Sequence, residues 1–207
     1  MTILGKYVVV GVVGVTARGS VSTARRAGAR RPLFALKQYN SAQPDPDEPH
    51  WDCQQFLDRA RVQRSVVAAG GRYWVAVHDM GLTPDGAWVV TDYHPLSAQK
   101  LIDAKVGLDA VALHNLVNSV VRGLVELQQV RRRPHGGLKP SNVLISGGGD
   151  LADARVMLTD PAQGVGEGEK GDLYALGELI HQLVLHRPFA GAAKWPLPED
   201  EAWQRLG

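Results

Sequence analysis

The first third of the chain alternates short β-branched runs with turn residues, a pattern that predicts β-strands. A strand over residues 7–10, a glycine-bearing turn and a second strand ending at residue 25 predict a hairpin. A turn around Gly28 leads to a third predicted strand over residues 33–39. The proline-rich stretch 43–49 can be neither helix nor central strand, so we predict a linker there.

After this linker the pattern changes to one helix followed by two strands. Residues 51–69 fit a helix with apolar residues loosely on one face. Residues 73–77 and 87–90 predict strands, and the turn residues 83–86 join them. The predicted order is therefore three strands, a helix and two strands.

The second half predicts helices with two short strands between them. Apolar residues recur at steps of three and four from Leu113 to Leu127, as in an amphipathic helix, which ends in three arginines and Pro134. Strands are predicted at 143–145 and 154–159, and a final helix opens at Asp172. The chain as a whole is predicted to be α+β.

Composition describes an ordinary globular protein. The 207 residues are 44% apolar and 21% charged, and the net charge of +2 is too small to suggest nucleic acid or a membrane as a partner. Short arginine clusters at 25–26, 30–31 and 131–133 are expected to be solvated turns rather than anion sites. The single cysteine, Cys53, excludes an internal disulfide. With no signal-peptide pattern and no long apolar run, we expect a cytoplasmic protein.

One stretch, residues 135–145, carries the strongest candidate chemistry. A histidine, two glycines and Leu-Lys-Pro-Ser-Asn run into the apolar strand that begins at Val143. This stretch resembles the catalytic loop of protein kinases, His-Arg-Asp-Leu-Lys-Pro-x-Asn. In this chain Gly136 replaces the arginine, and Gly137 replaces the aspartate that accepts the substrate's hydroxyl proton.

Further segments resemble protein-kinase motifs in the same order along the chain. They are the opening at residues 4–7, the glycine loop with Gly14 and Gly19, the Ala-x-Lys of Lys37, the interlobe hinge at 91–95, Asp160 in place of the Asp-Phe-Gly aspartate, Asp172 opening a central helix, and the exit at 187–189. In the family, the aspartate at the position of Asp172 accepts hydrogen bonds from the backbone of the catalytic loop.

The resemblance also implies nucleotide and metal ligands. They are Gly14, Gly19, Lys37, Asp92, Tyr93, His94, Lys139 and Asn142 for ATP, and Asn142 and Asp160 for Mg²⁺. Plainer interpretations stay open. The glycines suit a simple hairpin, a strand lysine is often a solvated edge charge, and Asn142 can be a polar cap that fixes its loop. Two possibilities for the cofactor therefore stay open: ATP with Mg²⁺, or no cofactor.

Other kinase features are missing. In a kinase a glutamate of the following helix pairs with the lysine at the position of Lys37. In this chain Arg59 or Val62 occupies that glutamate's position, and Asp58 is the nearest carboxylate, so we expect this ion pair to be weakened. Only residues 161–171 replace the long activation segment, and they contain no Ser, Thr or Tyr. We also expect a truncated second lobe, because the last kinase helices have no counterpart before residue 207.

The resemblance implies a two-lobed protein-kinase-like fold with an N-lobe over residues 1–92 and a C-lobe over 93–207. A minimal domain and a domain excised from a longer protein are both open. The missing base predicts a pseudokinase, a regulatory or scaffolding module that binds protein partners, with ATP binding open. The alternatives are an ATP-dependent transferase with atypical chemistry or weak kinase activity, and a structural module whose pocket is filled by side chains.

Overall fold

The fold is α+β and consists of two compact units. The structure is a computed structural model that describes residues 3–31, 34–40, 51–147, 149–162 and 168–189. Unit 1 comprises residues 1–68 and 75–94, and unit 2 comprises residues 69–74 and 95–207. The sequence-based division at residue 92 had placed residues 69–74 in the first lobe. The linker predicted at 43–49 lies outside the described residues.

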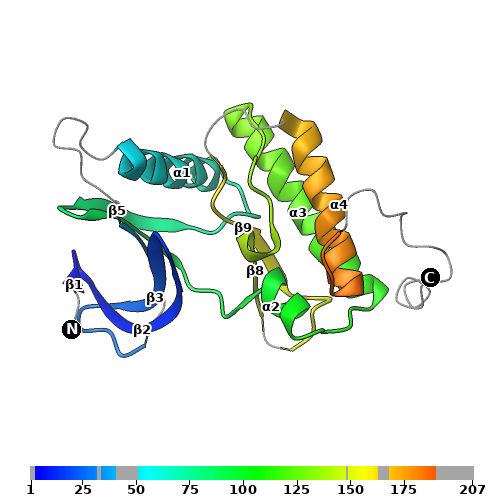
Figure 1. Cartoon of the computed structure of the whole chain (residues 1–207), viewed down its shortest axis with the longest axis horizontal. Coiled ribbons are helices and arrows are strands. Elements are labelled where there is room, and N and C mark those ends of the chain that lie inside the picture. Colours follow the sequence, from blue (N-terminus) through cyan, green and yellow to red (C-terminus); the bar gives the residue numbers. More distant parts are fainter. Residues whose placement is uncertain (1–2, 32–33, 41–50, 148, 163–167, 190–207) are drawn as a thin grey trace. The chain divides into compact units, whose positions relative to one another are not determined.

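Unit 1 is an antiparallel sheet with one helix (Figure 1). The sheet has the order β1-β2-β3-β4-β6-β5. Its strands are β1 (Ile3–Leu4), β2 (Tyr7–Thr16), β3 (Gly19–Arg26), β4 (Phe34–Asn40), β5 (Val77–Thr83) and β6 (Gly86–Asp92). Helix α1 (Trp51–Ala68) lies between β4 and β5 in the chain. The predicted order of three strands, a helix and two strands is therefore confirmed for β2 to β6, and the two-residue strand β1 precedes it unpredicted.

The two faces of this sheet have separate cores. Trp88 and Val90 of β6 pack with Leu36 of β4 on one face. The alternate residues of β6, Ala87 and Val89, pack on the other face in a cluster that includes residues of α1. The α1 residues in this cluster are Cys53, Leu57 and Ala60, spaced four and three residues apart as one helical face requires.

Two predictions for unit 1 are wrong in detail. The predicted glycine-bearing turn does not interrupt β2. The pairing with β3 shifts register between Val9 and Gly11 and again between Val12 and Gly14, and these bulges let the strand continue past both glycines. Gly14 is therefore a strand residue, paired with Val21 of β3. The predicted strand at 73–77 is also wrong, since β5 begins only at Val77.

Residues 72–74 belong instead to unit 2, where polar contacts hold them. The Glu126 carboxylate accepts hydrogen bonds from the Arg72 and Tyr73 N–H groups at 2.8 and 3.1 Å. The Trp74 indole donates to the Gly123 carbonyl at 2.9 Å, and Trp74 forms a parallel bridge with Leu158. These contacts satisfy the backbone that a longer β5 would otherwise have paired.

Unit 2 is mainly helical. Its elements are β7 (Leu96–Ser97), α2 (Ala98–Asp103), α3 (Ala110–Arg131), the 3-10 turn η1 (Pro140–Asn142), β8 (Val143–Ser146), β9 (Arg155–Leu158) and α4 (Gly168–Leu185). The strands form a small antiparallel sheet in the order β7-β8-β9. Helices α3 and α4 lie side by side (Figure 1). The predicted helices and strands of this half are confirmed, although α4 begins four residues before Asp172.

Both ends of α3 are capped by local sequence. The Asp109 carboxylate accepts a hydrogen bond from the Ala112 N–H at 2.8 Å, which satisfies one of the donors left free in the first turn. At the other end Arg132 takes a left-handed conformation with φ 53°. The arginine run thus ends the helix, as predicted. No helix among the described residues is long and apolar enough to cross a membrane.

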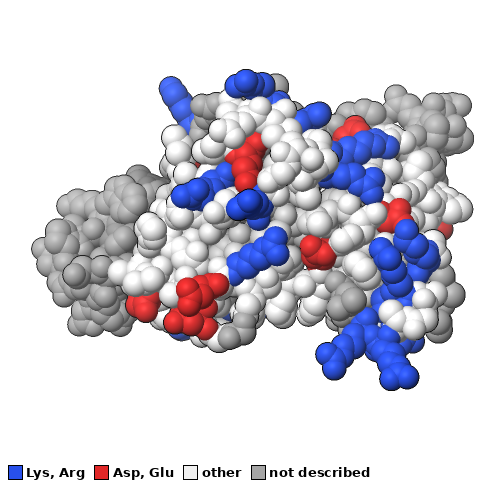
Figure 2. All heavy atoms as spheres, turned by 180° about the vertical axis from the view of Figure 1, so that it is seen from behind, with Lys and Arg blue, Asp and Glu red and all other residues white. Residues whose placement is uncertain are grey.

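The arginine cluster of the turn after β3 makes local contacts. An Arg25 side-chain N–H donates to the Ala29 carbonyl at 3.4 Å, and the Arg26 guanidinium lies 5.6 Å from the centre of the Phe34 ring. Figure 2 shows Lys and Arg side chains gathered at one edge of the face it draws, and mixed with Asp and Glu elsewhere on that face. Local contacts of this kind are compatible with the predicted solvated turns.

Candidate functional site

The candidate site is the loop of residues 135–142, which α4 holds by one carboxylate. Asp172 is 6% exposed and accepts two backbone hydrogen bonds from the loop. Its Oδ2 accepts from the His135 N–H at 2.6 Å, and its Oδ1 accepts from the Gly136 N–H at 2.8 Å. The hydrogen bonds expected of this aspartate are therefore confirmed. Charge-assisted bonds of this kind are roughly twice as strong as neutral ones.

His135 is the buried centre of the loop. Its side chain has 0% exposure, and its ring stacks on Trp74 with 5.6 Å between ring centres. Nδ1 accepts from the Gly137 N–H at 3.2 Å, which assigns the proton to Nε2, 3.2 Å from the Thr159 carbonyl. Burial lowers the pKa of His135, against the opposing effect of Asp172, so the neutral imidazole is the form that fits.

The two glycines of the loop lie against Ala162. A Cβ added to Gly137 would come within 3.2 Å of the Ala162 Cβ, and one added to Gly136 within 3.4 Å. Gly136 also has φ 67°, a conformation that glycine adopts without strain. The Ala162 N–H donates to the His135 carbonyl at 2.7 Å, and the Arg133 guanidinium donates to the Ala162 carbonyl. Ala162 is therefore fixed where a side chain at residue 137 would pass.

Asn142 closes the loop from its other end. Its side-chain NH₂ donates to the Gly137 carbonyl at 2.9 Å, and its backbone N–H donates to the Lys139 carbonyl at 2.9 Å. Its own carbonyl accepts from the Thr159 N–H at 3.1 Å. The interpretation of Asn142 as a polar cap that fixes the loop is thus confirmed. Its Oδ1 accepts no hydrogen bond from the described residues, so this oxygen can still serve a ligand.

Asp160 and Lys139 are the other candidate ligands in unit 2. Asp160 lies two residues after the end of β9 and has φ 56°, an uncommon conformation for a residue other than glycine. Lys139 is exposed and precedes η1. Among the described residues, no three His, Cys, Asp or Glu side chains form a metal-binding group. Any magnesium ion at Asp160 would need the Asn142 oxygen, water or phosphate to complete its shell.

The candidate glycines of unit 1 differ from one another. A Cβ added to Gly14 would meet no atom within 4 Å, so packing does not require glycine there. A Cβ added to Gly19 would collide with the Gln38 carbonyl oxygen of β4, because β3 and β4 approach closely at this pair of residues. Packing alone therefore explains Gly19 and leaves Gly14 unexplained.

Lys37 lies on the face of the sheet that α1 covers. It pairs with Val89 across the β4–β6 ladder, and paired residues in antiparallel strands point to the same face. Val62 of α1 is buried and apolar, and Arg59 is exposed, so neither predicted clamp position carries a carboxylate. Asp58 forms an ion pair with Arg61 at 2.5 Å.

The hinge candidates Asp92, Tyr93 and His94 end unit 1. The Asp92 carboxylate lies 2.6 Å from His78 Nε2, and the Asp92 N–H donates to the Ala76 carbonyl at 3.2 Å. The Asp92 side chain is thus already paired with a histidine, whereas Tyr93 and His94 follow the end of β6.

Sequence reasoning missed three residues that shape the loop. Trp74 stacks on His135, Ala162 fills the space beside the glycines, and Arg133 binds the Ala162 carbonyl. These contacts join residues 25 to 61 positions apart, so no local pattern indicates them.

A scan of the sequence against models of known protein families gives no match, and a search of curated proteins gives none either.

Proposed function

We propose that this chain is a degenerate protein-kinase-like domain, a pseudokinase that does not transfer phosphate and acts as a regulatory or scaffolding module for protein partners. In this proposal the two units correspond to the two lobes of a kinase. The order of elements in unit 1 and the α+β content support it, together with the motif resemblance of residues 135–145.

One observation carries the proposal. The loop that resembles a kinase catalytic loop is held by Asp172, while the position of its base is Gly137. Kinase catalysis consists mostly of positioning and electrostatics, in which the loop aspartate orients the attacking hydroxyl. A general base contributes about 10²–10⁴ in rate. A glycine at this position supplies no carboxylate, and a Cβ added to it would come within 3.2 Å of the Ala162 Cβ.

Nucleotide binding is a separable part of the proposal. Asn142 and Asp160 would hold Mg²⁺, whose preferred ligands are amide and carboxylate oxygens, and Lys37 and Lys139 would contact phosphate. The Asn142 Oδ1, which accepts no hydrogen bond from the described residues, fits such a ligand. Bound Mg²⁺ would neutralise phosphate charge. The remaining protein groups would only bind and orient the nucleotide.

The test is thermal unfolding of the full chain with ATP at millimolar concentration, with and without Mg²⁺. Binding to the folded state raises the stability by about 2.7 kcal/mol when the ligand is at 100 times its Kd. Asp160→Ala should remove only the Mg²⁺-dependent part of the shift, whereas the matched exposed variant Asp153→Ala should keep all of it. A shift that Asp160→Ala leaves unchanged would show that the metal position is misassigned. No shift at all would remove nucleotide from the proposal.

A further inference from the structure

Unit 2 has an apolar groove between α3 and α4. The groove has a volume of about 230 Å³ and is lined chiefly by Val121, Leu124 and Val125 of α3 and by Leu173 and Leu176 of α4. Leu176 is 8% exposed and forms its floor. Val121, Val125 and Leu173 are 38, 48 and 65% exposed, so large apolar side chains face solvent on both walls. Contiguous exposed apolar surface of this kind marks interaction sites.

One end of this groove is cationic and incompletely hydrogen-bonded. Arg133 lines it and uses one terminal nitrogen on the Ala162 carbonyl. The Arg133 Nε is buried and has no hydrogen-bond partner among the described residues, and the same holds for Oε1 of Gln128, which also lines the groove. Burial, and then the charge of Arg131, lower the pKa of Arg133. The one carboxylate in the groove lining, that of Asp172, accepts the His135 and Gly136 N–H groups.

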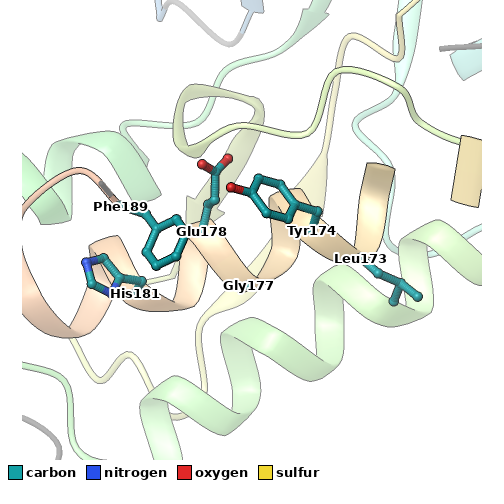
Figure 3. A pocket seen from close by; sticks show the side chains of 6 residues that line it. All are labelled: Leu173, Tyr174, Gly177, Glu178, His181 and Phe189. Carbon is teal, nitrogen blue, oxygen red and sulfur yellow. The ribbon is translucent and has the colours of Figure 1, made fainter. Parts of the chain in front are cut away.

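The apolar surface continues around α4 beyond Leu173. A second hollow of about 180 Å³ shares Leu173 with the groove and is bordered by Tyr174, Glu178 and Phe189. Gly177 creates this hollow, because a Cβ there would meet no atom within 4 Å. Figure 3 shows the Phe189 ring beside His181, with Tyr174 and Glu178 projecting from the same side of α4. Leu173 therefore stands on the ridge between two unfilled hollows.

We propose that the α3–α4 groove binds an amphipathic helix of another protein, with apolar side chains on the valines and leucines and an acidic side chain on Arg133. This inference rests on the proposed function, since it names the surface and partner chemistry of a protein-binding module. The lined stretch from Val121 to Gln128 rises about 10 Å, which two turns of a bound helix match. The apolar anchors of that helix would recur at i, i+3 or i+4, and i+7.

Charge favours a foreign acidic partner over a second copy of the chain. Arg133 lines the groove, and Arg131 and Arg132, which precede it in the chain, are exposed. A second copy using the same surface would bring three more cations to the interface, where like charges are costly. An acidic side chain instead would pair with the part of the Arg133 guanidinium that the groove exposes.

The experiment selects binders for the full chain from a display library of helix-forming peptides, and then measures synthetic peptides by fluorescence anisotropy. Selected peptides should share apolar residues at i, i+3 or i+4, and i+7 and at least one Asp or Glu. Leu173→Asp and Val125→Asp should each weaken binding by about tenfold or more. Arg133→Gln should weaken the binding of acidic peptides and leave the binding of peptides without acidic residues unchanged. Val111→Asp is the matched control, because Val111 is a 63% exposed valine of α3 outside the groove, and it should bind normally.

Several results would overturn the inference. These are the absence of selected peptides, peptides without acidic residues, and binding that Leu173→Asp leaves intact. A dimer seen by light scattering and lost in Leu173→Asp would assign the groove to a second copy. If peptides bind only after the substitutions Trp195→Ser and Trp203→Ser, the groove would be assigned to apolar residues of the chain itself. Each of these results would contradict only the assignment of the groove to an acidic helix. Phosphate transfer by the chain would instead contradict the proposed pseudokinase function.

Discussion

Two segments of this chain resemble parts of a kinase that handle nucleotide, and folding treats them differently. The loop 135–142 is centred on a fully buried histidine and is held by Asp172 and Asn142. The β2–β3 hairpin is exposed, with Val12 and Val15 at 67 and 74%. In the loop, hydrogen bonds account for His135, Asn142 and Asp172, whatever the protein does. In the hairpin, packing accounts for Gly19 but not for Gly14.

The comparison separates residues kept by folding from residues that need another explanation. Gly19 belongs to the first group, and Gly137 lies close to it, because a Cβ there would press on the Ala162 Cβ at 3.2 Å. Gly14 belongs to the second group. The loop is held by hydrogen bonds and carries no base, as the proposed scaffold function requires. The exposed hairpin is where a ligand effect of Gly14 can be sought with little loss of stability.

The largest expected effect comes from removing the carboxylate that holds the loop. Asp172→Ala abandons the His135 and Gly136 N–H donors, and each unsatisfied buried donor costs about 1–3 kcal/mol. We expect the free energy of unfolding to fall by about 2–4 kcal/mol, the lower half of the summed range because Gly136 is exposed. The free energy of unfolding of Asp172→Asn, which keeps one acceptor oxygen, should lie between those of Asp172→Ala and wild type. Urea unfolding and amide hydrogen exchange measure this.

Asp150→Ala is the control for that change. Asp150 also accepts a backbone hydrogen bond, from Ala152, but it is exposed, so the loss should stay within about 1 kcal/mol. Equal effects of the two alanine variants would show that Asp172 does not hold the loop.

A smaller effect is expected in the hairpin, where two glycines can be compared directly. Gly19→Ala forces a Cβ against the Gln38 carbonyl and should destabilise unit 1 by about 1–3 kcal/mol. Gly14→Ala meets open space in a strand and should change stability by no more than about 0.5 kcal/mol. Urea unfolding of both variants measures the difference. If Gly14→Ala proves as costly as Gly19→Ala, the contrast between loop and hairpin fails.

The smallest expected effect is the pH dependence contributed by His135. Its pKa is lowered in the folded state, so the unfolded chain binds the proton more readily. The stabilisation is complete above the unfolded pKa of about 6.5 and is lost as the pH falls below it, by at most about 1.4 kcal/mol for each pH unit. Protonation would also turn Nδ1 into a donor facing the Gly137 N–H. Asp172, Asp160 and Arg133 are the charged groups that oppose or assist this shift.

The measurement is the free energy of unfolding between pH 5 and 7.5 for wild type and His135→Gln. The wild type should lose more stability than the variant as the pH falls. A variant that loses as much as wild type would show that another group produces the pH dependence.

Much of unit 2 was predictable because its signals are local or belong to one motif. The apolar spacing of α3 and the strand after Asn142 followed from the sequence pattern. The two hydrogen bonds of Asp172 were implied by the resemblance of its motif to that of protein kinases. The errors arose where distant residues decide. Trp74 was predicted in a strand, but its indole donates to the Gly123 carbonyl in unit 2. Gly14 was predicted in a turn, but bulges let β2 continue through it. The closeness of Ala162 to Gly137 is visible only in three dimensions.

The most direct test of the central claim is transfer of the γ-phosphate from labelled ATP, with Mg²⁺, to the chain itself and to mixed Ser, Thr and Tyr peptides. We predict no transfer above that of a heat-denatured sample, from wild type or from Gly137→Asp, whose new Cβ would press on Ala162. Transfer by wild type that depends on Lys37 and Asp160 would contradict the account.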